Sequence, residues 1–484
     1  MSGRPASRCV ESFGERTRQR LNLRSKQAVT VPQRPGFCTP RFVRRRGMAL
    51  SSSNIATGRA ADSTLEHSAV RKAARRFIPL LALAYFFNYL DRTSVGFAAL
   101  TMNRDLDLTA TQFGWGAGIM FAGYCLFEIP SNLALYRFGA RRWLARIMIT
   151  WGLFAAATAL AVGPKSFYAI RLMLGIGEAG FFPGVIFFLA VWFPPAYRTR
   201  VLAWFTVSTP LSSLVGGPLS AGLLHMDGVF GLAGWRWMFV VQGLPACVLG
   251  FLVLKMLADK PADAEWLSLD ERQALQRAFD REDTSSRKKK NFVAALKDVR
   301  TYILAMISFG FTMGSYGIGI WLPQMLRAHG MSVAKTGWMS AVPYFFATVA
   351  LLWWAKRVDS RGGPIANLAA GLLIGAIALG VSTYFHQLLP TMAGLTLALI
   401  GTIAGRTIFY TLPNSFLSGQ AAAGGLAFIN SFGALGGFVG PYLIGYLKDG
   451  FGTFSAGMIG LSIALGITTL LTLSLHAFGS GEQA

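Results

Sequence analysis

Residues 167–193 read FYAIRLMLGIGEAGFFPGVIFFLAVWF, an apolar run that contains two charged side chains, Arg171 and Glu178. A helix of about 20 mostly apolar residues crosses the hydrocarbon core of a bilayer, so this segment predicts a membrane span with charges inside it. The whole chain has the same character. Of its 484 residues, 53% are hydrophobic and 14% are charged, with a mean hydropathy of +0.45. Soluble domains carry about 25% charged residues, so the composition indicates an integral membrane protein.

The formal net charge of +24 is unevenly distributed along the chain. Twelve Lys and Arg residues precede Met48, against Glu11 and Glu15, and much of the remaining excess falls in short loops between apolar runs. Basic residues that flank apolar segments fix membrane topology, so the charge does not indicate nucleic-acid binding. We expect no metal site, disulfide framework or cofactor, because the four cysteines form no CxxC pair. These cysteines are Cys9, Cys38, Cys125 and Cys247.

Residues 1–70 are expected to form a disordered basic leader. Residues 1–47 are rich in arginine and contain no apolar stretch long enough for a signal peptide or a span. They are a disordered tail, a targeting leader, or a segment that is not translated because the true start is Met48. A basic cluster then stands directly before the first span, which places that cluster in the cytoplasm. Its members are Arg71, Lys72, Arg75 and Arg76.

Apolar windows of about 20 residues predict an all-α membrane protein with twelve spans in two sets of six. The first set occupies residues 71–257 and the second residues 301–475, followed by a short tail at 476–484. The charged segment 258–300 between them reads as a cytoplasmic linker that is partly an amphipathic helix. Cations gather after even-numbered spans, so both termini are expected in the cytoplasm. The predicted spans are 77–99, 112–135, 143–161, 167–193, 201–224, 236–257, 301–324, 337–355, 365–385, 391–416, 421–447 and 453–475.

The two sets of spans repeat one another at a constant offset of 223 residues. A constant offset across a loop motif and a later GPxxxG element indicates a duplicated six-span unit. Parallel repeats of this kind hold the substrate near the bilayer midplane, between the two halves. The matching pairs are Tyr136 with Asp359, Gly139 with Gly362, Gly217 with Gly440, Pro218 with Pro441, and Gly222 with Gly445.

Several motifs resemble, in the same order, those of a known transporter family. The loop YRFGARR (136–142) and its echo VDSRGG (358–363) resemble the loop signature of the major facilitator superfamily, although Tyr136 replaces the usual acid and so weakens any charge latch in the first half. Within that superfamily, the anion:cation symporter family is similar at YLDRTSVGFA (89–98), FEIPSN (127–132), RLMLGIGEAGFFPG (171–184) and INSFGALGGFVGPYLIGYL (429–447).

This resemblance implies a substrate class, a mechanism and a location. The symporter family takes up organic acids such as tartrate, galactonate, phthalate and 4-hydroxyphenylacetate together with protons. We therefore expect the major facilitator fold and secondary active import of a carboxylate through alternating access. The protein is expected in the plasma membrane, which is the inner membrane of a bacterium.

Charged side chains inside the spans are the first candidates for the site. Each costs about 2.5 to 3.5 kcal/mol at a helix centre on insertion scales, so it needs a partner or a water-filled cavity. Arg171 and Glu178 lie about 10 Å apart along one helix face, and Asp91 directly precedes Arg92 in the first span. The resemblance implies proton coupling by Asp91 and Glu178 and anion binding by Arg92 and Arg171. Alternatively, the four groups only neutralise one another and hold the first half together.

Other positions in the spans are further candidates. Glu128 either pairs with the basic loop after span two or takes part in transport. Arg406 is a second anion contact, a gate, or a residue that snorkels toward the interface. In the superfamily, spans one, seven and ten line the cavity, which implies substrate contacts from side chains on those spans. The candidates are Tyr89, Tyr316, Trp321 and Asn414, with Phe409 and Tyr410 beside them.

Three other functional classes were weighed against import. An enzyme is not expected, because no HExxH, GxSxG or Walker loop stands in a suitable context. A proton-driven exporter of drugs or metabolites with the same fold is the main alternative, and a paired cation and acid in the first half favour uptake of an anion over it. A receptor that binds without transporting is the third. The expected partners are an organic acid, a proton and the bilayer, and a monomer suffices for this fold.

Overall fold

The computed structural model describes residues 49–283, 298–385, 387–413 and 419–479. Within these ranges every regular element is a helix. The chain divides into two units, residues 1–59 and residues 60–484, and the second unit holds the membrane bundle. Most of the expected leader, residues 1–48, lies outside the described residues.

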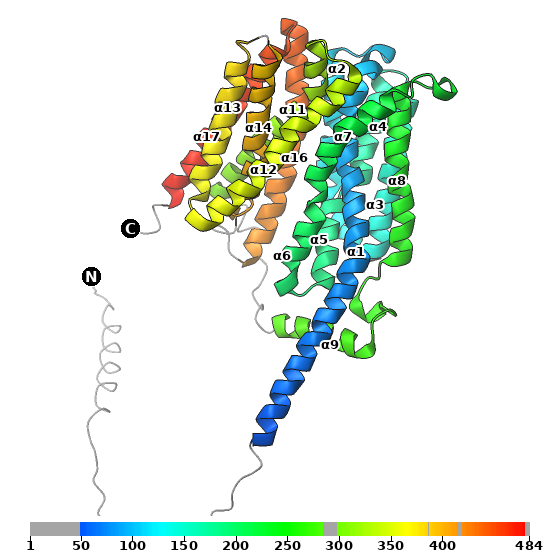
Figure 1. Ribbon diagram of the computed structural model, residues 1–484, viewed down its shortest axis with the longest axis vertical. Helices are drawn as coiled ribbons and strands as arrows, with labels where there is room; N and C mark the ends of the chain where they lie inside the picture. The colour runs from blue at the N-terminus through cyan, green and yellow to red at the C-terminus, as the bar shows by residue number, and fades with distance from the viewer. Residues whose placement is uncertain (1–48, 284–297, 386, 414–418, 480–484) are drawn as a thin grey trace, which may run out of the picture. The chain divides into compact units, whose positions relative to one another are not determined.

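The membrane bundle consists of two groups of helices that stand side by side (Figure 1). The first group, the N-half, contains α1 (Ala49–Asp105), α2 (Ala110–Phe138), α3 (Ala140–Ala157), η1 (Thr158–Leu160), α4 (Pro164–Glu178), α5 (Phe181–Trp192), α6 (Pro195–Thr206), α7 (Ser208–Leu224), η2 (Val229–Gly231) and α8 (Gly234–Met256). The linker contributes η3 (Pro261–Asp263) and α9 (Leu269–Asp283). The second group, the C-half, contains α11 (Val299–Ala328), α12 (Val333–Arg361), α13 (Pro364–Ser382), α14 (Leu388–Phe409), α16 (Gly419–Phe451) and α17 (Phe454–Gly479).

Ten helical segments of the described chain are long and apolar enough to cross a membrane. Two predicted spans are not among them, and both are nevertheless helical. Residues 77–99 lie inside α1, where Asp91 and Arg92 lower the local hydropathy. Residues 201–224 are divided between α6 and α7, each of which is shorter than 18 residues.

Helix α1 begins well before the expected start of the bundle at Arg71. Ala69 is fully buried and Val70 is nearly so, and the Ser68 hydroxyl donates a hydrogen bond of 2.8 Å to Glu271 of α9. The linker helix therefore docks on a part of the chain that the sequence assigned to the leader. The reason is tertiary, because α9 supplies the contact that orders these residues from about 200 positions away in the chain.

Predicted span four is not one continuous helix. It breaks between Glu178 and Phe181, where Gly180 has a φ of +87° that favours glycine. The Ser131 hydroxyl donates a hydrogen bond of 2.6 Å to the carbonyl oxygen of Ala179. A Cβ on Gly180 would lie 2.5 Å from the Ser131 hydroxyl oxygen. Broken helices are tolerated at membrane depth where the backbone is buried in protein or lines a cavity. The break leaves Glu178 as the last residue of α4.

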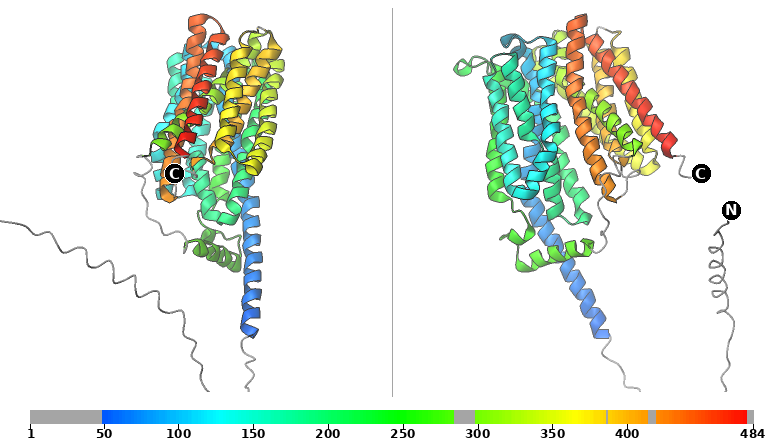
Figure 2. Two further views of the ribbon diagram at one scale, coloured as in Figure 1. Left: turned by 90° about the vertical axis from the view of Figure 1, so that its left-hand side faces the viewer. Right: turned by 180° about the vertical axis from the view of Figure 1, so that it is seen from behind.

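The two ends of the bundle differ in how the halves meet. Helix α9 lies at one end, here called the linker end; the opposite end, where α1 stops at Asp105 and α2 begins, is the far end (Figures 1 and 2). Toward the far end, α2 packs against α16, and α7 packs against α12. Both pairs of helices approach so closely that glycines face the backbone of the partner helix. A Cβ on Gly114 would lie 2.4 Å from the Pro441 carbonyl oxygen, and one on Gly217 would lie 2.5 Å from that of Gly337. The halves are therefore closed against each other at the far end.

A carboxylate from the C-half also caps a helix of the N-half at the far end. Asp449, near the end of α16, accepts hydrogen bonds of 3.1 Å and 2.7 Å from the backbone N–H groups of Ala110 and Thr111. These residues form the first turn of α2, whose N–H groups have no partner within their own helix. The Asp449 carboxylate thus joins the two halves at the far end.

Candidate functional site

The centre of the site is an ion pair between α1 and α4 that reaches into the C-half. Nε of Arg92 donates a 2.8 Å hydrogen bond to Oε1 of Glu178, and Nη2 donates to the same oxygen. Nη1 of Arg92 donates a hydrogen bond of 3.1 Å to the hydroxyl oxygen of Tyr316 on α11. The Glu178 side chain is fully buried, whereas 14% of the Arg92 side chain is exposed. Arg92 therefore links α4 of the N-half to α11 of the C-half.

Asp91 and Arg171 are the second pair of opposite charges at this site. Arg171 is fully buried and Asp91 is 1% exposed, and the two attract each other electrostatically. One guanidinium nitrogen of Arg171, Nη2, lies 3.4 Å from the sulfur of Met120 on α2. The structure thus brings together all four charged residues that the sequence selected.

Several buried polar atoms of these four residues have no hydrogen-bond partner within the described part of the chain. They are Nε and Nη1 of Arg171, Oδ2 of Asp91 and Oε2 of Glu178. Buried polar groups are normally satisfied, and a partly satisfied network is costly at low dielectric. A purely structural pair of salt bridges would satisfy its own donors and acceptors. The open donors of Arg171 suit a carboxylate, and the open oxygens of the two acids suit a proton.

Aromatic rings from both halves surround Arg92. The Tyr316 ring lies 4.5 Å from that of Phe121 and 6.5 Å from that of Tyr89, measured between centroids. The Arg92 guanidinium lies 5.2 Å from the Tyr124 ring and 5.7 Å from the Phe121 ring, within the range of cation–π attraction. The sequence analysis missed Phe121 and Tyr124. Their spacing from Glu128, at seven and four residues, places the three on one face of α2 and could have revealed them.

Trp321, a further predicted substrate contact, lies away from Arg92. Trp321 is fully buried, and its indole N–H donates 2.9 Å to the Pro441 carbonyl. Its ring packs against Phe113 and Phe454 at centroid distances of 5.1 Å and 5.6 Å, so the structure places it in the far-end packing and not beside Arg92. Asn414 lies outside the described residues.

Glu128 and Arg406 both face the region between the halves. Oε2 of Glu128 accepts a 2.8 Å hydrogen bond from Ser431 of α16, so its partner in the structure is the C-half and not the basic loop. The Arg406 guanidinium lies 5.8 Å from the Tyr410 ring and interacts electrostatically with Tyr89 and Tyr316. Arg406 therefore belongs with the tyrosines of the site and does not snorkel away from it.

Comparisons with known proteins agree with this architecture. The family model of the Major Facilitator Superfamily matches residues 81–441. A relative from Agrobacterium vitis, provisionally named a tartrate transporter, is 44% identical over 86% of this chain and 96% of its own length. A quinolone resistance transporter of Acinetobacter baumannii is 39% identical over 85% of this chain and 96% of its own length. The inner membrane transport protein RhmT of Escherichia coli is 34% identical over 86% of this chain and 96% of its own length.

A solved structure confirms the fold. The bacterial homologue of the human lysosomal transporter Spinster, in an inward-facing and occupied conformation, matches with a TM-score of 0.65 at 18% identity. The match covers 82% of this chain and 95% of that one. Both halves, the order of their helices and the family match agree with the expected duplicated bundle. The chain belongs to the major facilitator superfamily of transporters.

Proposed function

We propose that this protein imports an organic carboxylate together with protons across the bacterial inner membrane, with the linker end in the cytoplasm. The observation that carries the proposal is the set of open atoms at the site. Arg171 has two free donors in a buried position, and Asp91 and Glu178 each have a free oxygen. The relative named for tartrate transport makes tartrate the first substrate to test.

Charge balance links the anion to the proton. The two acids and two arginines of the site sum to zero, and a bare anion that enters would leave uncompensated negative charge in a buried place, which is costly. In the proposed cycle the substrate carboxylate accepts a hydrogen bond from an open donor of Arg171 and competes with Glu178 for Arg92. The bond between Glu178 and Arg92 breaks, and the released carboxylate takes up a proton. A dianion such as tartrate needs a second proton, for which the open oxygen of Asp91 is the site, and the anion and its protons then cross together.

The closed far end supplies the other requirement of transport, which is access from one side at a time. With the linker end in the cytoplasm, the backbone contacts of Gly114 and Gly217 close the extracellular side. Opening the far end requires breaking these contacts and the hydrogen bonds of Asp449.

Uptake by purified protein tests this function. Proteoliposomes with an alkaline interior should accumulate labelled tartrate above the external concentration, and an internal pH dye should report acidification when tartrate is added. Collapse of the pH gradient with a protonophore should abolish accumulation. If no member of a panel of dicarboxylates, sugar acids and aromatic acids is accumulated, the proposed function is wrong.

Export of a drug is the second candidate, because one relative is named a quinolone resistance transporter. Proton antiport would move the drug outward as protons enter. Inverted membrane vesicles energised to an acidic interior should then accumulate a fluorescent quinolone, and tartrate should have no effect. We expect no quinolone accumulation and clear tartrate uptake in the opposite vesicle orientation.

A further inference from the structure

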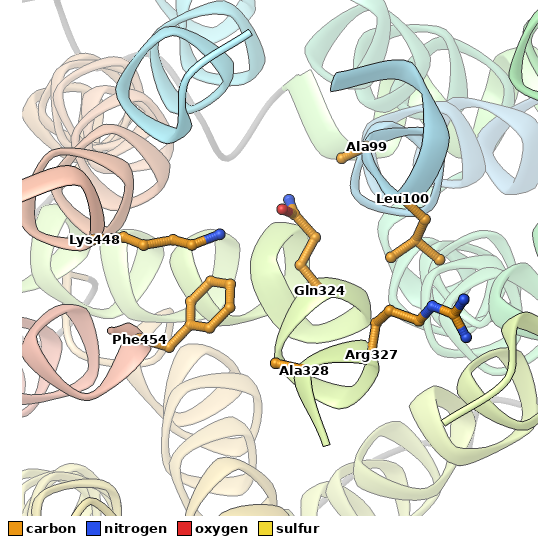
Figure 3. Close-up of a pocket in the computed structure, with 7 residues that line it drawn as sticks. All are labelled: Ala99, Leu100, Gln324, Arg327, Ala328, Lys448 and Phe454. Carbon is orange, nitrogen blue, oxygen red and sulfur yellow. The ribbon is translucent and has the colours of Figure 1, made fainter. Parts of the chain in front are cut away.

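A cavity of about 230 Å³ lies at the far end, between α1, α11, α16 and the start of α17 (Figure 3). Its polar lining comes from the C-half, whereas Ala99 and Leu100 of the N-half contribute apolar surface. The cavity is separate from the central site, because none of the four central charged residues lines it. The polar lining residues are Gln324, Arg327 and Lys448.

The side chains that line this cavity offer several hydrogen-bond donors, with the side-chain carbonyl oxygen of Gln324 as an acceptor beside them. The ammonium of Lys448 lies 4.1 Å from the Phe454 ring and 5.4 Å from the Trp321 ring, and within the described chain it has no hydrogen-bonded acceptor. Nε2 of Gln324 is buried without a partner in the same ranges. Arg327 uses Nη1 to bind the Met331 carbonyl, which leaves its other N–H groups for a ligand. Figure 3 shows the Lys448 side chain extending toward Gln324, and the Arg327 guanidinium on the other side of Gln324 from Lys448.

The nearest acid does not neutralise this cluster by contact. Asp449 attracts Lys448 electrostatically, but its two carboxylate oxygens accept the backbone N–H groups of Ala110 and Thr111. No Asp or Glu lines the cavity. Two cations and an amide donor, with the Lys448 ammonium beside the Phe454 and Trp321 rings, have the chemistry to bind an anion.

The size of the cavity restricts the anion. Pockets for drug-sized ligands have volumes of about 300 to 1,000 Å³, and this cavity is smaller. A carboxylate on a short carbon chain fits within this volume. The chemistry is therefore that of the substrate class proposed for the central site.

We propose that Lys448, Arg327 and Gln324 form an outer site that binds a small carboxylate anion at the extracellular mouth, before it reaches the central site. This inference rests on the proposed function for the identity of the anion and for the side on which it arrives. Cations at the mouth raise the local concentration of anions, an effect that salt screens over about 8 Å at physiological ionic strength. All three residues belong to the C-half and move with it when the far end opens.

Transport kinetics from each face test the outer site. In right-side-out vesicles, the double variant Lys448→Gln with Arg327→Gln should raise the KM for tartrate about tenfold, which corresponds to about 1.4 kcal/mol, with Vmax unchanged. Inverted vesicles should show the wild-type KM, because tartrate then enters from the linker end. The wild-type KM in right-side-out vesicles should rise with salt, and that of the double variant should rise less. Lys448→Arg alone should keep a near wild-type KM because it keeps the charge.

The matched control is the double variant Lys165→Gln with Lys335→Gln. These lysines are exposed at the far end and do not line the cavity, so the variant loses the same charge from the same face. A KM equal to that of the control would overturn the outer site, as would a loss of Vmax or an equal change of KM in both vesicle orientations. In those cases the residues serve the gate or the general surface charge.

Direct binding separates this inference from the proposed function. Calorimetric titration of the detergent-solubilised wild-type protein with tartrate should show two binding events, and the double variant at Lys448 and Arg327 should lose one of them. An unchanged number of binding events would contradict the outer site even if transport fails. Absence of wild-type uptake contradicts the proposed function, whereas normal uptake with an unaltered external KM contradicts only the outer site.

Discussion

At the scale of single residues, Arg171 is the most specific test of anion binding. Lysine keeps the charge but is a point donor, whereas the planar guanidinium holds Nε and Nη1 as two open donors in fixed directions for oxygen atoms of the substrate. Arg171→Lys should therefore weaken tartrate binding at least about tenfold, or about 1.4 kcal/mol, with normal membrane insertion. Titration calorimetry measures the loss. Arg104→Lys is the control, because the Arg104 side chain is 89% exposed at the far end. Wild-type affinity in Arg171→Lys would remove Arg171 from the site.

Glu178 carries the prediction about coupling. Glu178→Gln keeps an oxygen that can accept from Arg92 but has no group that titrates, so it mimics the protonated acid. We expect this variant to exchange labelled for unlabelled tartrate across the membrane and to fail to accumulate it under a pH gradient. Asp91→Asn should behave in the same way if both acids carry protons. The exposed linker residue Glu265, changed to Gln, is the control. Gradient-driven accumulation by both Glu178→Gln and Asp91→Asn would show that neither acid couples transport to protons.

At the scale of elements, the cap of α2 by Asp449 should bias the conformation. A carboxylate at a helix N-terminus contributes about 0.3 to 1 kcal/mol, and up to about 2 kcal/mol where it is partly buried. Asp449→Asn loses the negative charge, so the population with an open far end should rise severalfold. Spin-label distances across the far end would report the shift. Asp107→Asn removes an exposed acid from the same end and should leave the distances unchanged. Equal distance distributions in wild type and Asp449→Asn would exclude a role for this cap in closure.

The contact between α9 and α1 predicts a pH-dependent linker. Burial would raise the pKa of Glu271, but hydrogen bonds from Lys72, Ser68 and the Ser268 backbone lower it from 4.5 to about 2. Because the folded pKa is depressed, the stabilising contribution is full above pH 4.5 and is lost as the pH falls toward 2. Relative to the intrinsic exchange rate at each pH, the protection of amides in residues 261–283 should therefore be high at neutral pH and fall over that window.

Substitution of Glu271 tests the same contact at neutral pH. Glu271→Gln should speed hydrogen exchange of the linker, because hydrogen bonds to a charged group contribute about 1.5 to 3 kcal/mol. Glu265→Gln, an exposed neighbour in the linker, should not. Slow exchange retained in Glu271→Gln would mean that apolar contacts alone hold the linker, such as the stacking of Trp192 on Trp266 with ring centroids 5.6 Å apart.

At the scale of the whole molecule, the protein should work as a monomer. Arg92, Glu178 and Tyr316 come from both halves of one chain, so the central site needs no second copy. Uptake per milligram should stay constant as the protein density in liposomes falls below one copy per vesicle. A steep fall of specific uptake upon dilution would instead indicate that an oligomer is the active form. Light scattering of the detergent-solubilised protein should give the mass of one chain.

The sequence by itself determined the class of protein, the duplicated bundle and the choice of central charges. Long apolar runs predict spans because lipid requires every backbone group to bond within its own segment, which makes a span a local property. The cost of a charge in lipid is also local, so Asp91, Arg92, Arg171 and Glu178 stood out without any knowledge of their neighbours. The structure places all four at one site.

Only the tertiary structure decided how those charges pair and what surrounds them. Arg92 binds Glu178 from 86 positions away and Tyr316 from 224 positions away, distances along the chain over which periodicity carries no information. The break at Gly180 and the contact of Glu271 with Ser68 likewise depend on a side chain from another helix. The outer cavity exists because the ends of four helices converge there. Such contacts follow from the rotation of each helix about its axis, which the packing of the bundle sets and hydropathy does not.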